Sequence, residues 1–126
     1  MKDISNRQDI EFLVSTFYEQ LLLDELMHPF FEELDLDHHL PVICDFWESI
    51  LLGNIVYRSN AMEKHLQLNE SRPIRKEHFI SWIDHWQKTV DTHFRGSTAK
   101  EAKRRAGMVA KLMEYKINQS GQIGRM

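Results

Sequence analysis

Two histidines, His39 and His65, stand among apolar residues, where an imidazole could bind a metal ion or hydrogen-bond a buried ligand. His39 lies four residues before Ile43 on the apolar face of a predicted helix, so its ring is expected to point inward. His65 follows Met62 by three residues in a predicted short helix, which a metal–imidazole bond would stabilise. Either ring could instead be a core histidine that bonds a backbone group.

Tyr18 and Trp82 each carry one polar hydrogen into a predicted apolar region. Tyr18 follows Phe17 on the inner half of the first long predicted helix, and Trp82 lies in a stripe of large aromatic residues. Both side chains could simply pack in the core with their polar atom at its edge. Both could also donate a hydrogen bond to a buried ligand.

Other potentially reactive residues lack the spacing that metal binding or catalysis requires. His38 and His39 are adjacent, so on a helix they face different directions. No serine or cysteine elbow accompanies Asp84, His85 and Asp91, so a hydrolytic triad has no support. The sequence contains neither an HExxH motif nor a cysteine pair. Three further histidines are about two helical turns apart, too far for one metal ion: His78, His85 and His93.

The candidate residues require helices that position them, and the first of these begins after a capping-box pattern, Ser5-x-x-Gln8. This helix is expected to weaken near Asp24, and Pro29 begins a short segment that ends at Phe31. Its apolar stripe has helical spacing and consists of Ile10, Leu13, Val14, Phe17 and Leu21.

A second helix is predicted after Asp35 and Asp37, which are typical start signals. Because proline is tolerated only in the first turn, Pro41 requires the helix to begin just before it. Gly53 ends the helix. The apolar stripe contains His39, Ile43, Phe46, Trp47 and Ile50.

The rest of the chain also has helical periodicity. Asn60-x-x-Glu63 offers a cap for the short helix of His65, and residues 69–76 are expected to form a loop. A helix with Phe79, Trp82, Ile83, Trp86, Val90 and Phe94 inward then ends at Gly96. Thr98-x-x-Glu101 is a further capping box, which precedes Ala102, Ala106, Val109, Met113 and Ile117. The polar residues after Ile117 are expected to fray. No segment alternates with period two, so the predicted fold class is all-α.

Length and composition restrict the function further. The 126 residues fit a single domain, 1–126, with a core of about 5–118 and a polar tail at 119–126. The net charge of −3 gives no basic field for nucleic acid. Cys44 is the one cysteine and cannot form an internal disulfide, which favours a reducing compartment. No segment approaches the ~20 apolar residues of a membrane span, and the N-terminus lacks a signal peptide's apolar run. We therefore expect a cytoplasmic protein.

An ordered series of short phrases from about residue 10 to residue 117 resembles the group III truncated haemoglobins, small bacterial globins. Two positions depart from that pattern: Ser59-Asn60-Ala61 replaces a Gly-x-Pro-like turn, and Leu36 stands near a position often held by tryptophan. The matching phrases are Phe17-Tyr18, Leu26 to Phe31, His39-Leu40-Pro41, Phe46-Trp47, Leu51-Leu52-Gly53, Tyr57, Met62, His65-Leu66, His78-Phe79-x-x-Trp82, Thr89-Val90-Asp91, Phe94-x-Gly96, Ala99 and Arg105-Ala106.

The resemblance implies a truncated globin fold, a two-on-two helical sandwich around haem b, and a role for each matching residue. His65 would be the proximal ligand of the haem iron. Tyr18 and Trp82 would donate hydrogen bonds to a ligand on the distal side, and His39 would be the distal histidine. Phe17, Ile43 and Trp47 would wall the distal cavity, while Tyr57, Met62 and Phe79 would touch the porphyrin elsewhere. Lys64, Arg72 and Arg75 are candidate partners of the haem carboxylates.

The implied function is binding of O2, NO and CO at a ferrous iron, for ligand sequestration or for detoxification of reactive nitrogen and oxygen species. An NO dioxygenase-like or peroxidase-like activity would need a reductase as partner and, for peroxidase chemistry, a distal base, for which His39 is the candidate. The alternative is a haem-free helical interaction or regulatory domain with a globin-like core. Neither nucleic acid nor a membrane is an expected partner.

Overall fold

The computed structural model describes residues 1–32, 35–54 and 74–124, with side chains as far as Ile117. In these ranges the chain forms α-helices and one short 3-10 helix, without a strand, which confirms the all-α prediction. None of these helices is long and apolar enough to cross a membrane. The elements are α1 (Arg7–Leu23), η1 (His28–Phe30), α2 (Leu36–Leu52), α4 (Lys76–His93) and α5 (Ser97–Gly124).

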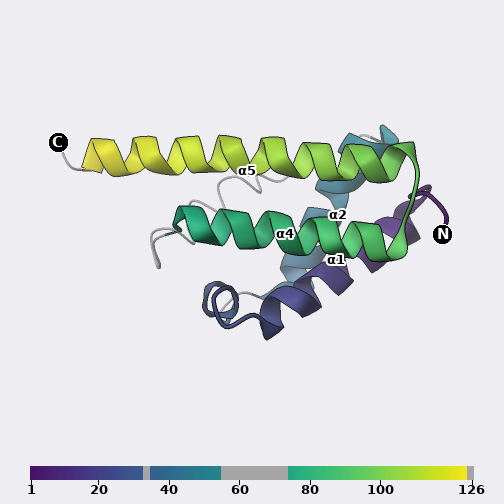
Figure 1. Ribbon diagram of the computed structural model, residues 1–126, viewed down its shortest axis with the longest axis horizontal. Coiled ribbons are helices and arrows are strands. Elements are labelled where there is room, and N and C mark those ends of the chain that lie inside the picture. The colour runs from purple at the N-terminus through teal and green to yellow at the C-terminus, as the bar shows by residue number, and fades with distance from the viewer. Residues whose placement is uncertain (33–34, 55–73, 125–126) are drawn as a thin grey trace.

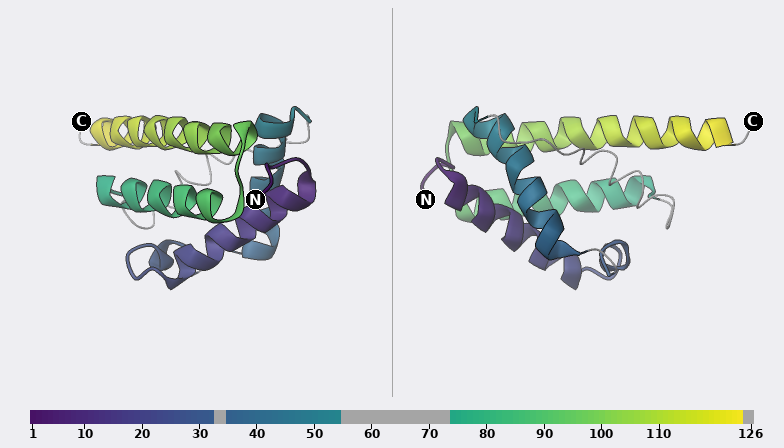
Figure 2. Two further views of the ribbon diagram at one scale, coloured as in Figure 1. Left: turned by 45° about the vertical axis from the view of Figure 1, so that its right-hand side comes forward. Right: turned by 180° about the vertical axis from the view of Figure 1, so that it is seen from behind.

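The four long helices pack as two pairs. α1 packs against α2, and α4 packs against α5; contacts between α1 and α4 join the two pairs. Figures 1 and 2 show α4 and α5 side by side, with α1 on the other side of α4. α2 runs obliquely past α4, from the first turns of α5 toward η1, and contacts α5. α5 extends well past α4 at its C-terminal end.

The core has two parts that meet at Trp82. The larger part contains the predicted stripe of α1, from Ile10 to Leu21, whose side chains are all almost completely buried. The smaller part lies between α4 and α5 and contains Phe79 and Met113. Trp82 is half-buried and packs against both parts. The inward stripe predicted for the last helix is confirmed, except that Val109 is only half-buried and Ala110 is buried instead.

The start of α1 differs from the predicted capping box at Ser5. Asn6 is the cap, and its side-chain oxygen accepts a hydrogen bond from the backbone N–H of Asp9 at 2.9 Å. Ser5 instead donates from its backbone and its hydroxyl to the Asp9 carboxylate. Asparagine is as good a cap as serine, and here it stands one residue closer to the first apolar position.

The bounds of α2 confirm the predicted start after Asp35 and the predicted stop at Gly53, which adopts a left-handed conformation with φ 76°. The prediction that Pro41 lies in the first turn is wrong, because the helix begins at Leu36 and Pro41 is inside it. Proline removes one N–H from the helical hydrogen bonds. Burial of His39 and Ile43 on either side holds the helix together across this gap.

The start of α5 also differs from the predicted box at Thr98. The Asp3 carboxylate accepts hydrogen bonds from the backbone N–H groups of Thr98 and Ala99 at 2.9 and 2.8 Å. Gly96 permits this approach: its φ is 142°, and a Cβ there would lie 2.5 Å from the Asp3 carboxylate. A residue distant in sequence therefore supplies the cap. α5 itself continues to Gly124.

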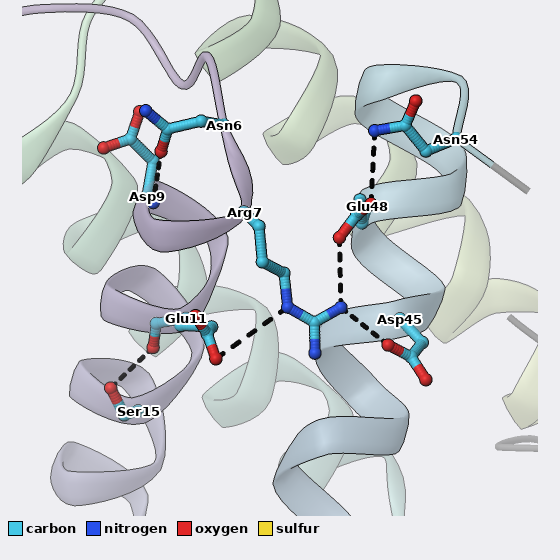
Figure 3. A network of polar contacts seen from close by, with 8 residues as sticks. All are labelled: Asn6, Arg7, Asp9, Glu11, Ser15, Asp45, Glu48 and Asn54. Atoms are coloured by element: carbon cyan, nitrogen blue, oxygen red, sulfur yellow. Dashed lines mark hydrogen bonds and ion pairs between the residues drawn. The ribbon is translucent and has the colours of Figure 1, made fainter. Parts of the chain in front are cut away.

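A network of charged side chains joins α1 to α2 (Figure 3). Nη1 of Arg7 lies 2.6 Å from Asp45 and 3.1 Å from Glu48. Glu48 is buried, and its second oxygen accepts a hydrogen bond from the Asn54 amide at 3.1 Å. The network therefore extends from the first turn of α1 to the end of α2.

Candidate functional site

The structure brings Tyr18 of α1 and His39 of α2 together in the core. The Tyr18 hydroxyl oxygen lies 2.9 Å from Nε2 of His39, and the two side chains belong to residues that are only 3% and 6% exposed. Burial, with a smaller contribution from Cys44, raises the pKa of the Tyr18 phenol well above its ordinary value. The phenol is therefore neutral at physiological pH and keeps the hydrogen that it can donate.

The side chains predicted to wall the distal cavity are buried in the same core as this pair. Phe17, Ile43 and Trp47 are 2%, 6% and 2% exposed. The Phe17 ring meets the Tyr18 ring edge to face, with 5.4 Å between their centroids. Tyr18 and His39 thus share a water-excluded apolar environment, where a hydrogen bond is stronger than in water.

An apolar pocket that is partly open to solvent lies beside this group, between η1, the first half of α4 and α5. Phe79 and Trp82, two of the predicted site residues, line it. Sequence reasoning assigned no site role to the other lining residues, although the phrase Pro29-Phe30-Phe31 and the inward position of Met113 contained that information. Those other residues are Met27, Phe30, Phe31, Ile74, His78 and Met113.

The Tyr18–His39 pair is separated from this pocket by aromatic rings. Phe31 lines the pocket and meets the Tyr18 ring edge to face at 5.5 Å. Trp82 lines the pocket and meets Phe17 in the same way at 5.7 Å. Tyr18 and His39 do not line the pocket themselves: Phe31 links Tyr18 to it, and Phe17 with Trp82 forms a second link.

The pocket wall formed by η1 is tied to α4 through Asp24. One oxygen of this carboxylate accepts hydrogen bonds from His85 at 2.7 Å and from Ser81 at 3.0 Å, both on α4. The other oxygen accepts from the backbone N–H of Leu26 at 2.8 Å. The hydrogen bond from His85, followed by those from Leu26 and Ser81, lowers the pKa of Asp24 despite partial desolvation.

Several predicted site residues lie outside the described part of the chain: Tyr57, Met62 and His65, and also Lys64 and Arg72. Arg75, the remaining candidate partner of a haem carboxylate, is exposed beside the start of α4. Its backbone N–H donates to Nδ1 of His78 at 2.8 Å. His78 is the polar side chain among the described lining residues.

A family model described as bacterial-like globin matches residues 2–118 of this sequence. The chain belongs to the bacterial-like globins. It is similar to the group 3 truncated haemoglobin ctb of Campylobacter jejuni, with 26% identity over 111 residues, which cover 83% of this globin and 85% of that protein. This likeness confirms the resemblance to group III truncated haemoglobins.

A solved structure leads to the same family. The crystal structure of a group III truncated haemoglobin from Campylobacter jejuni matches this globin with a TM-score of 0.79 at 25% sequence identity. The match covers 93% of this globin and 95% of the solved chain. The paired helices seen here are therefore a truncated globin fold.

Membership of this family implies haem binding and binding of oxygen at the haem, and the described residues fit that group. Haem is a flat, largely apolar body that requires an apolar slot and an axial base. The lining residues provide an aromatic and aliphatic slot with a polar side chain, His78, at one position. The buried Tyr18–His39 pair provides polar groups next to it. Haem-based binding of small ligands is the general function of this fold.

Proposed function

We propose that this globin holds haem b in the described pocket with His65 as the proximal iron ligand, and that it binds O2, NO and CO there. Its role would be ligand sequestration or detoxification of reactive nitrogen and oxygen species. The observation that supports this proposal is the buried Tyr18–His39 pair, which lies one aromatic ring from the apolar pocket.

When bound, haem would supply a ferrous iron as the binding position for a diatomic ligand, and a bound O2 would carry partial negative charge that hydrogen-bond donors can stabilise. Tyr18 does not line the pocket, so it would reach that ligand only after the Phe31 ring beside it shifts, and the raised pKa of the phenol would keep its O–H protonated for donation. Trp82, which lines the pocket, would donate its indole N–H. Each such hydrogen bond contributes about 1 kcal/mol, and about 1.4 kcal/mol corresponds to a tenfold change in affinity.

His39 determines how free Tyr18 is to make that bond. In the present arrangement the Tyr18 oxygen and Nε2 of His39 are hydrogen-bonded at 2.9 Å. If Nε2 of His39 is the acceptor, the Tyr18 O–H is engaged in that hydrogen bond. If Nε2 carries a hydrogen and donates, the Tyr18 O–H remains available for the ligand. The tautomer of His39 thus controls the donor, and His39 is also the candidate base for peroxidase-like chemistry.

The remaining contacts complete the proposal. Phe17, Ile43 and Trp47 exclude water from the distal side, as their burial requires. Tyr57, Met62 and Phe79 would contact the porphyrin, and Lys64, Arg72 and Arg75 are the candidate cations for its carboxylates. We place the protein in the cytoplasm, where a reductase would be needed to keep a bound haem iron in the ferrous state.

Replacement of His65 by alanine tests the proximal role. We expect the His65→Ala variant to lose stable haem retention, because the iron loses its axial base. The measurement is the Soret absorbance of the purified protein after haem addition and gel filtration. His38→Ala is the matched control, since the His38 side chain is 88% exposed. Retention equal to that of the control would move the proximal role to another residue.

The alternative function, a haem-free interaction or regulatory domain, is distinguished by the same experiment. A wild-type sample that stays colourless after haem addition would support it. A Soret band in the wild-type protein would exclude it.

A further inference from the structure

Three tryptophans form a continuous stack that begins at the pocket. Trp82 lines the pocket, and its ring is nearly parallel to that of Trp86, with 7° between the planes and 6.4 Å between the centroids. Trp86 in turn stacks on Trp47 of α2, with 4.5 Å between centroids and 20° between planes. Among the described residues Trp82 and Trp47 meet only through Trp86.

The two inner rings of this stack are shielded from water, and the central one, Trp86, retains its indole N–H proton. Trp86 is 0% exposed and Trp47 is 2% exposed. The indole N–H of Trp86 donates to the backbone carbonyl of Ala102 at 3.1 Å. A carbonyl oxygen is a hydrogen-bond acceptor but not a base that removes a proton at neutral pH. An oxidised Trp86 would therefore remain a radical cation and could be refilled by an electron from a neighbouring ring.

We propose that Trp82, Trp86 and Trp47 form a one-electron relay that carries oxidising equivalents from the haem pocket to Trp47. Indole is among the most easily oxidised side chains, whereas a phenylalanine ring such as that of Phe17, which touches both Trp82 and Trp86, is not. Stacking for aromatic packing alone requires large rings at these positions, but it does not require three indoles in contact. The relay rests on haem binding in the pocket and not on the proposed roles of Tyr18 or His39.

The electrons balance with hydrogen peroxide as the oxidant. Its O–O bond breaks in the pocket, and two electrons delivered through the tryptophans together with two protons from solvent convert the peroxide into two molecules of water. Trp82 gives up one electron, Trp86 refills Trp82, and Trp47 refills Trp86. Because Trp47 is only 2% exposed, a one-electron donor of the ascorbate or phenol class then reduces it by electron transfer from the protein surface and not by direct contact. Two electrons pass along the stack for each molecule of peroxide, so two donor molecules are consumed.

The test is to locate the oxidised residue after peroxide is added to the haem-loaded protein without an external donor. Freeze-quench electron paramagnetic resonance detects the radical, and peptide mass spectrometry locates the oxidised indoles. The variants are Trp86→Phe, which interrupts the stack while keeping an aromatic ring, and Trp47→Phe, which removes its end. Tyr115→Phe is the control, since Tyr115 is exposed on α5.

In the wild-type and control proteins we expect a tryptophan radical and oxidation products at Trp47. In Trp86→Phe, oxidation at Trp47 should be lost and should remain at Trp82. In Trp47→Phe, the product should stay at Trp86 and Trp82, and donor-dependent peroxide turnover should fall. Circular dichroism and the Soret band would establish that each variant is folded and loaded, and a poorly folded Trp86→Phe leaves Trp47→Phe to decide.

Other outcomes would overturn the relay. Oxidation of Trp47 in Trp86→Phe at the wild-type level, or products confined to tyrosine or methionine, would show that the stack carries no charge. A haem-loaded protein that forms no tryptophan radical would contradict the relay and leave the proposed function standing. A wild-type protein that takes up no haem would contradict both.

Discussion

At the scale of single residues, Tyr18 shows how the same burial that stabilises the fold also determines chemistry. Its ring packs in the core against Phe17 and Phe31, while its hydroxyl oxygen is paired with His39. Desolvation favours the neutral phenol, so the group remains a donor under all physiological conditions. The residue type could be singled out from the sequence, but its partner could not, because 21 positions separate the two residues.

Replacing Tyr18 by phenylalanine should speed O2 release from the haem-loaded protein. The variant keeps the aromatic ring and loses only the hydroxyl, so we expect a rate about tenfold higher for each lost hydrogen bond of about 1.4 kcal/mol. Stopped-flow measurement of O2 dissociation is the appropriate assay. The exposed Tyr115→Phe serves as control. A rate equal to that of the control would mean that another group holds the ligand.

At the scale of elements, the interiors of the helices were predictable and their ends were not. The apolar period of α1 depends on local sequence, and its five predicted positions are all buried. The cap of α5 is different, because Asp3 supplies it from the other end of the chain. Local capping patterns at Ser5 and Thr98 satisfied the rules and were nevertheless not used. Competition between local and distant acceptors is decided by tertiary packing, which a local pattern does not contain.

The hydrogen bonds of Asp24 attach the part of the pocket wall that contains η1 to α4, so one substitution at Asp24 should weaken that attachment. Asp24→Asn should lower the free energy of unfolding by about 1 kcal/mol, since an amide has one acceptor oxygen for three donors. Because the pKa of Asp24 is lowered, mainly by the His85 hydrogen bond, its stabilisation is complete above the unfolded value of about 3.9. It should be lost as the pH falls through the lower folded value.

The measurement for Asp24→Asn is denaturant unfolding at a series of pH values, with amide hydrogen exchange at Met27 and His28 as the local readout. The difference from wild type should be constant near neutral pH and should shrink below about pH 4. Asp84→Asn is the matched control, because Asp84 forms an exposed ion pair with Lys88 on the same helix. If the two variants unfold alike at every pH, Asp24 does not hold the pocket wall.

At the scale of the whole molecule, the sequence predicted the fold class because every described element has helical periodicity, and the family resemblance supplied the arrangement. The pocket could not be predicted in the same way. Its lining comes from η1, α4 and α5, and residues such as Met27 and Ile74 have no periodic signature. The proximal residues His65, Met62 and Tyr57 remain predictions, since they lie outside the described residues.

The Arg7 network connects the helix pair α1–α2 as a unit (Figure 3). Arg7→Leu should cost about 2 kcal/mol of unfolding free energy, because it leaves the buried Glu48 without its cation. Adding Glu48→Gln should recover part of that loss, since the uncompensated charge is then removed. Urea denaturation measures both, and Lys88→Leu, which breaks an exposed pair, is the control. If the Arg7→Leu variant were as stable as the Lys88→Leu control, the Arg7 network would not be needed for the stability of the fold.

The Asp3 clamp on α5 also gives the chain an order of assembly. Its two hydrogen bonds join residues that are 95 and 96 positions apart, whereas the residues in contact within each helix pair are closer in sequence. Because long loops cost more entropy to close, such contacts form after local ones. The first turn of α5 should therefore be completed late in folding and should open early in unfolding. The segment that contains Asp3 would thus be among the last to reach its place.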